Sequence, residues 1–95
     1  MPEINFKIEW PDGTQQICYS PSLVVKQYFT SGEKYELTDF VEKSRTALNI
    51  ASDRVKEAYG FPCSRALVQL QQIELKASEY QQLSEPKVLF LEFSQ

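Results

Sequence analysis

The sequence contains no histidine. That absence excludes the Ser-His-Asp and Cys-His catalytic arrangements, the usual histidine-containing zinc sites and the ordinary proton shuttle of neutral pH. Only three glycines are present, each at a separate predicted turn, so the chain has no glycine-rich loop to cradle a phosphate. The acidic residues also lack the spacing of a calcium-binding loop. We therefore expect neither a metal nor a cofactor.

Long apolar runs and an excess of positive charge are absent as well. No stretch approaches the ~20 apolar residues that a membrane span needs, and the first residues have neither the basic nor the apolar region of a signal peptide. The formal net charge is −3, with acidic and basic residues interleaved, which predicts no nucleic-acid partner. These features indicate a cytoplasmic protein, without a membrane partner, whose two cysteines are reduced thiols.

The chain does have enough apolar residues to form a core. Hydrophobic residues make up 42% of the sequence and aromatic residues 13%, which supports burial without metals or disulfides as staples. A chain of this length buries roughly 60–65% of its unfolded surface in one core. We therefore expect a single domain over residues 1–95.

The first segment predicts a strand with one apolar face. Apolar and polar residues alternate without a fault over residues 4–10, and the Pro-Asp-Gly sequence of residues 11–13 favours a turn. Residues 15–19 predict a second strand that completes a hairpin. The alternation places these apolar side chains on one face: Ile4, Phe6, Ile8 and Trp10.

Three helices are predicted after the hairpin. A short helix covers residues 23–29, with Ser20 as its cap. A long helix covers residues 37–59 and carries one apolar stripe over five turns, with Thr38 as its cap. A second amphipathic helix covers residues 64–83, and its glutamines lie largely off the apolar stripe.

The element order β-β-α-α-α-β predicts an α+β domain of two layers. Residues 88–91 are apolar on both faces, so the last strand should lie inside the sheet. We expect a three-stranded, mainly antiparallel sheet with strand order 2-1-3, because the alternating first strand is the better candidate for pairing on both sides. Two long helices should cover its apolar face.

Two residues are candidates for a catalytic role, although no catalytic group is firmly predicted. Cys63 precedes the second long helix, whose dipole favours a thiolate there; the alternative is a small residue packed at the helix end. Pro2 would offer a secondary amine if Met1 is removed. Residues 2–8 loosely resemble the start of tautomerase-superfamily domains, but this chain then turns into a hairpin, which those domains do not.

Aromatic residues gather near the predicted turns. Tyr28, Phe29 and Tyr35 flank the turn at residues 30–32, and Phe61 follows the long helix. Because tyrosine and phenylalanine are enriched in the cores of protein interfaces, these four residues are candidates for a partner-binding patch. The alternative is that they form the rim of the core.

A set of motifs is spread over nearly the whole chain. They are Trp-Pro-Asp-Gly at 10–13, the segment 18–26, Arg-Thr-Ala-Leu at 45–48, Ala-Ser at 51–52, Arg-Val at 54–55, Tyr-Gly-Phe at 59–61 and Cys-Ser at 63–64. As a set, these motifs resemble the small bacterial nitrogen-starvation response proteins. The resemblance implies a gene cluster that also encodes a nitrilase-type carbon–nitrogen hydrolase, a radical-SAM protein, an acetyltransferase, a flavin-dependent oxidoreductase and a glycosyltransferase. It implies no catalytic residues.

Two hypotheses follow for the function. The first is a small non-catalytic accessory or adaptor protein that binds a partner protein, such as an enzyme of the nitrilase-type cluster. The second is an enzyme or small-molecule sensor that uses Cys63 or Pro2. Homodimerisation through a sheet edge or the aromatic patch is compatible with both.

Overall fold

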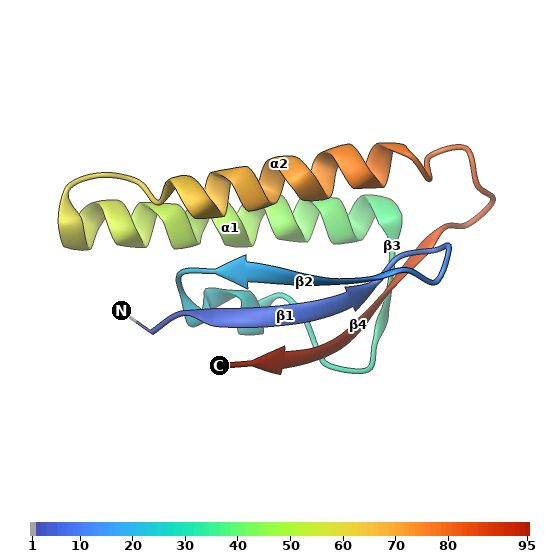
Figure 1. The fold of residues 1–95 in the computed structure, drawn as a ribbon, viewed down its shortest axis with the longest axis horizontal. Helices are drawn as coiled ribbons and strands as arrows, with labels where there is room; N and C mark the ends of the chain where they lie inside the picture. The colour runs from blue at the N-terminus through green and yellow to red at the C-terminus, as the bar shows by residue number, and fades with distance from the viewer. Residues whose placement is uncertain (1) are drawn as a thin grey trace.

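A computed structural model describes residues 2–95 and has two layers, a sheet and a pair of long helices (Figure 1). The helices lie side by side and, at the turn that joins them, extend past the ends of the strands. The predicted α+β class is confirmed. The elements are β1 (Ile4–Glu9), β2 (Gln15–Ser20), the 3₁₀ helix η1 (Leu23–Gln27), β3 (Lys34–Glu36), α1 (Leu37–Tyr59), α2 (Ser64–Ser78) and β4 (Lys87–Ser94).

The sheet has four antiparallel strands in the order β2-β1-β4-β3. The prediction of three strands in the order 2-1-3 is therefore wrong in its strand count, because β3 adds a fourth strand beyond β4. The first strand does pair on both sides, with β2 and with the C-terminal strand. Since β3 has only three residues, it is too short for an alternating pattern to reveal it.

The core lies between the inner face of the sheet and the helices. The predicted apolar face of β1 is buried throughout. Phe90 of β4 lies at the centre of a cluster of rings, with its centroid 5.7 Å from that of Phe6 and 5.0 Å from that of Phe29. Trp10 meets Phe40 of α1 edge to face at 5.8 Å. These ring contacts join β1, β4, α1 and the segment that follows η1.

β4 lies inside the sheet, as its apolar run predicts. It pairs with β1 on one side and with β3 on the other. Val88 and Phe90 point into the core, while Leu89 between them is only half-buried on the opposite face. The order β1-β4 brings the two ends of the chain into neighbouring strands.

The predicted cap of the short helix is wrong. The Ser22 hydroxyl accepts the backbone N–H of Val24 at 3.3 Å, and Ser22 is therefore the cap of η1. Ser20 is the last residue of β2, and its hydroxyl instead donates to the Ser22 carbonyl at 2.7 Å. The strand extends one residue further than predicted, while η1 begins at residue 23 as predicted and ends at Gln27, two residues earlier than predicted.

The predicted cap of the first long helix is also wrong. Thr38 lies inside α1, because β3 runs directly into the helix without a loop. The N-cap position is occupied by Glu36, whose side chain makes no capping hydrogen bond. The first turn of this 23-residue helix is therefore left without a side-chain cap.

The second long helix is shorter than predicted. α2 ends at Ser78, and residues 79–86 form a loop that leads to β4. The chain leaves the helix at the point where the Tyr80 ring stacks on Trp10, with 5.7 Å between centroids. Tyr59, the last residue of α1, belongs to the predicted apolar stripe of that helix but is exposed. The reason is that the C-terminal end of α1 extends beyond the sheet (Figure 1).

Replacing Phe90 with alanine should lower the free energy of unfolding by about 3–5 kcal/mol, because removal of a fully buried ring leaves a cavity. Phe61→Ala is the matched control, since Phe61 is 65% exposed, and should change that energy by less than about 0.5 kcal/mol. Urea unfolding followed by far-UV circular dichroism measures both. Similar losses in the two variants would contradict the assignment of the ring cluster as the core.

Candidate functional site

Cys63 lies where the sequence predicts it, at the N-terminus of α2. It occupies the N-cap position, is half-buried and makes no side-chain capping bond. Its backbone N–H donates to the hydroxyl of Ser52 in α1 at 3.2 Å, which ties the turn between the helices to the first helix. The position combines a partly accessible thiol with the positive end of a helix dipole.

The second cysteine, Cys18, is a core residue. Its side chain points inward from β2 and is almost fully buried. Burial raises the pKa of the Cys18 thiol to about 12, because a thiolate would lose its hydration there. Cys18 is therefore held in the protonated form at neutral pH.

Pro2 lies at the surface beside the start of η1. With Ser22, Leu23 and Arg54 it lines an open hollow of about 200 Å³. Arg54 reaches across from α1 and donates to the Ser22 hydroxyl at 3.2 Å, so that its guanidinium is already bound to the protein. The removal of Met1, on which a catalytic amine at Pro2 depends, lies outside the described residues.

The structure does not bring the four candidate aromatic residues into one surface patch. Phe29 is 3% exposed and belongs to the ring cluster of the core. Tyr35 is 9% exposed, and its hydroxyl accepts the backbone N–H of Thr30 at 2.7 Å. A partner can therefore contact only Tyr28, which is half-buried, and Phe61 directly. The core-rim alternative describes Phe29 and Tyr35 better.

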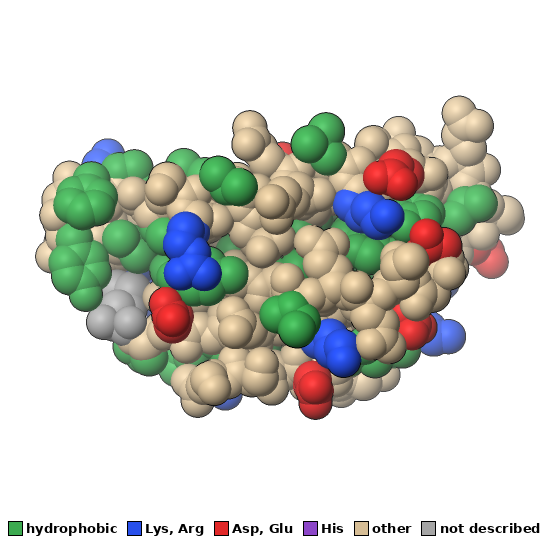
Figure 2. Space-filling view, in the orientation of Figure 1, with side chains coloured by type: hydrophobic (Ala, Val, Ile, Leu, Met, Phe, Trp, Pro, Cys, Tyr) green, Lys and Arg blue, Asp and Glu red, His purple; other side chains and the backbone are tan. Residues whose placement is uncertain are grey.

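The outward face of α2 carries no charge. Val68 and Leu75 lie one heptad apart, opposite the buried residues of the helix, and are 50% and 71% exposed. Space-filling shows hydrophobic side chains over the end where α1 meets α2 and at points along α2 (Figure 2). A solvated helix face usually carries charged residues. We call this face the outward strip; it comprises Ser64, Val68, Gln71, Gln72, Leu75 and Ser78.

The charged residues beside the outward strip are engaged with the protein itself. The Arg65 guanidinium lies 3.7 Å from the centroid of the Tyr19 ring. On the opposite flank, Glu74 pairs with Arg45 of α1 at 2.7 Å. These contacts hold the flanking charges beside the strip rather than over it.

Gln69 holds α2 against the free edge of the sheet. The sequence predicts this glutamine off the apolar stripe, but it lies on the buried side of the helix. Its Oε1 accepts the backbone N–H of Tyr19 in the edge strand β2 at 3.1 Å. The side-chain amide of Gln69 therefore forms a hydrogen bond with a backbone N–H of the edge strand that would otherwise be free to pair with another strand. The hollow of about 290 Å³ beside it is lined by Arg65 and Gln72 as well.

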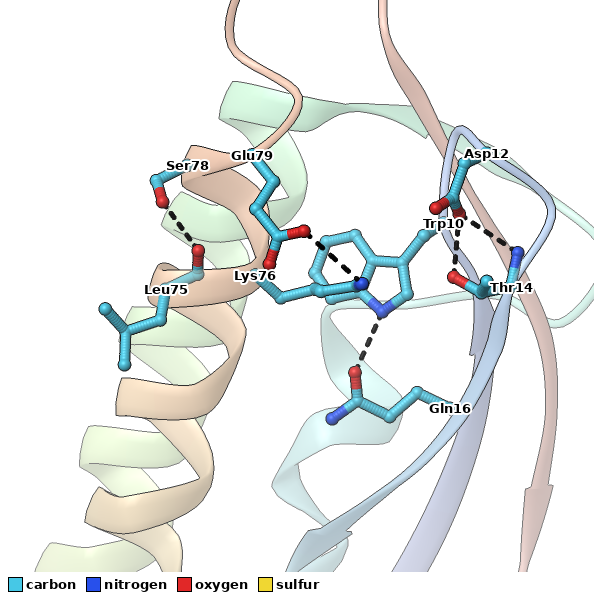
Figure 3. A network of polar contacts seen from close by, with 8 residues as sticks. All are labelled: Trp10, Asp12, Thr14, Gln16, Leu75, Lys76, Ser78 and Glu79. Carbon is cyan, nitrogen blue, oxygen red and sulfur yellow. Dashed lines mark hydrogen bonds and ion pairs between the residues drawn. The ribbon is translucent and has the colours of Figure 1, made fainter.

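Polar contacts close the turn between β1 and β2 where it faces the end of α2 (Figure 3). Trp10 Nε1 donates to Gln16 Oε1 at 2.8 Å. The Asp12 carboxylate accepts the hydroxyl of Thr14 at 2.7 Å and its backbone N–H at 3.0 Å. These two hydrogen bonds lower the pKa of Asp12 to about 2. Asp12 is thus fully ionised at neutral pH, and its contacts stabilise the turn.

Residues 2–95 contain neither a candidate metal site nor a candidate membrane span. No group of three or more metal-ligating side chains in that part of the chain is placed to hold an ion. None of its helices combines the length and the apolar character needed to cross a membrane.

These features define a small α+β domain in which most of the exposed large apolar residues lie on or next to α2, while Ile17 is exposed on the edge strand β2. The chain matches the model of the family described as nitrogen starvation-induced protein NitG over residues 5–93, and it belongs to this family. The resemblance inferred from the sequence motifs is thereby confirmed. No curated protein and no solved structure matches the chain.

The outward strip was not predicted, although the sequence contains a signal for it. Positions 64, 68, 71, 75 and 78 recur at steps of three and four residues, and none of them is charged. An uncharged second face on an amphipathic helix is a pattern that can be found without a structure. The aromatic residues of the predicted patch gave no such signal, because nothing in their spacing separates a core rim from a contact surface.

In the native protein, only Cys63 should react rapidly with a thiol reagent such as Ellman's reagent. Cys18 should react only after unfolding, because burial keeps its thiol protonated and covered. Absorbance at neutral pH should record one fast thiol per chain, and a second in denaturant. The Cys63→Ser variant should lose the fast phase; a fast phase that survives in this variant would contradict the assignment.

Proposed function

We propose that the protein is a non-catalytic accessory protein of the nitrogen-starvation response that acts by binding a partner protein through the outward strip of α2. The uncharged face of α2 is the observation that carries this proposal. The family description supplies the physiological context, nitrogen starvation. A cytoplasmic location is part of the proposal.

The outward strip has the chemistry that a protein interface needs. The cores of interfaces are depleted in charged residues, because a charge loses its hydration on binding. Val68 and Leu75 provide exposed apolar surface, and the glutamines beside them can exchange hydrogen bonds with water for hydrogen bonds with a partner. Phe61, which precedes α2 and is largely exposed, adds an aromatic side chain at its N-terminal end.

The partner we propose is an enzyme of the nitrilase-type cluster that the family resemblance implies. A second copy of this chain is the competing occupant of the same face. Because the strip is uncharged, two copies could meet there without repulsion. The two occupants are distinguished by the mass of the purified protein, which light scattering measures.

A tagged protein should recover one enzyme of that cluster in stoichiometric amount from nitrogen-starved cells of the native host. The double variant Val68→Lys and Leu75→Lys should lose it, because two lysines would have to be desolvated in the interface. The control is Thr46→Lys and Asn49→Lys on the exposed face of α1, which adds the same charge. Quantitative mass spectrometry measures the recovery, and thermal unfolding checks that both variants fold.

Equal recovery by the strip variant and the wild type would overturn the proposed surface. Recovery of the protein without any cluster enzyme would overturn the proposed partner. A dimer in light scattering that becomes a monomer in the strip variant would instead assign the surface to a second copy.

The alternative function, an enzyme or a small-molecule sensor, is favoured by one observation. Cys63 is a partly accessible thiol at the N-terminus of a 15-residue helix. A thermal-shift screen with a panel of metabolites tests it. A rise in melting temperature with a metabolite that disappears in the Cys63→Ser variant would support this function. If the same rise survives in the Pro2→Ala variant, it assigns the function to Cys63 rather than to Pro2.

A further inference from the structure

A groove runs between the first turns of α1 and the loop that follows α2. It consists of two adjoining hollows of about 370 and 240 Å³, which share the walls formed by Leu37, Thr38 and Gln81. The groove is separate from the outward strip, because the residue that α2 contributes to it, Ala77, belongs to the buried side of that helix.

The floor of the groove is apolar. Leu37 and Ala77 form its base and are largely covered by the protein, while Val41 and Pro86 line it from the sides and are half-buried. An apolar side chain placed in the second hollow would leave water for contact with Leu37, Val41 and Ala77. Burial of a leucine or phenylalanine side chain is favourable by roughly 1.5–3 kcal/mol.

One wall of the groove offers a backbone hydrogen-bond donor. The N–H of Leu37 donates to the Pro86 carbonyl at 3.0 Å. The next residue of α1, Thr38, lines both hollows. Its backbone N–H lies in the first turn, where the helix supplies no acceptor, and Glu36 provides no side-chain cap. This N–H can therefore donate to a carbonyl oxygen of another chain.

The rim of the groove is acidic. Glu42 and Glu85 line it, and neither forms an ion pair with any of the residues 2–95. Glu36 has only a distant pairing, with Lys87 at 3.7 Å. The one basic residue of the rim, Arg45, is bound to a glutamate of α2 at 2.7 Å. Two carboxylates of the rim, those of Glu42 and Glu85, thus have no matching cation among the described residues.

The backbone at Glu85 is strained. Its φ of 49° makes it the one residue other than glycine in the described chain with a positive φ. This conformation costs roughly 1–2 kcal/mol for a residue with a side chain. Such strain is found disproportionately at binding sites, and here it lies at the edge of the groove.

We propose that this groove binds a short extended segment of a partner protein in which lysine or arginine residues flank a leucine or phenylalanine. The apolar side chain fills the floor, a carbonyl oxygen of the segment accepts from the N–H of Thr38, and the cations pair with Glu42 and Glu85. Charge complementarity selects this occupant over a neutral or acidic segment. The inference goes beyond the function proposed above, because it concerns a second surface that binds or fails independently of the outward strip.

A library of displayed random dodecapeptides, selected on the full-length protein, tests the proposal. The enriched peptides should carry an apolar residue between basic ones. One such peptide, synthesised with a fluorophore, should bind the variant with Glu42→Lys and Glu85→Lys at least about tenfold more weakly than the wild type, since reversing two rim charges replaces attraction by repulsion.

The matched control is the variant with Asp53→Lys and Glu57→Lys. It makes the same change in net charge on the exposed face of α1, and both positions lie roughly 16–22 Å along the helix from Glu42. This variant should bind the peptide as the wild type does. Fluorescence anisotropy measures the affinities, and thermal unfolding checks that the variants fold.

Amide chemical shifts locate the bound peptide. The largest changes should fall on Thr38 and Gln81. Changes confined to Val68 and its neighbours on the outward strip would overturn the groove proposal while leaving the function proposed above in place. Enrichment of neutral or acidic peptides, equal weakening in the two charge variants, or no enrichment at all would also overturn it.

Discussion

The mutual stacking of the rings of Phe6, Phe29 and Phe90 is the contact on which the rest of the structure depends. It places the C-terminal strand beside the N-terminal one, and it fixes the segment after η1 over the sheet. Because β4 is held inside the sheet, the loop before it must pass the first turn of α1. That passage forms the groove and lets Pro86 accept the first N–H of the helix.

The residues that carry the family resemblance have structural roles. Ser20 and Ser22 fold the chain from β2 into η1, and Arg54 fastens that corner to α1. Ser52 receives the N–H of Cys63 and ties the two long helices at their turn. Such residues identify the fold and the family without revealing a chemistry. A family can therefore be recognised in this chain while its site has to be inferred from surfaces.

Local sequence patterns predicted the parts of the fold that repeat over several turns or residues. The alternation in β1 and the apolar run of β4 appear where they were expected, and the stripes of the helices do so except at positions such as Tyr59, which is exposed. The missed features depend on contacts between distant residues. β3 exists because it pairs with β4, and α2 ends early because Tyr80 stacks on Trp10. For the same reason Phe29 could not be told from a surface aromatic residue before its neighbours were known.

The proposal of a binding role rests on the distribution of polar groups. Acid–base catalysts need ionisable groups in environments that shift their pKa towards neutrality. The buried polar residues in the described chain are serines and one glutamine, and the buried thiol of Cys18 has its pKa raised to about 12. What distinguishes this domain lies instead on its surface, where one face is uncharged and a separate groove is apolar with an acidic rim. In the proposals made above, the uncharged face binds a folded partner and the groove binds an extended segment, which are two different modes of recognition.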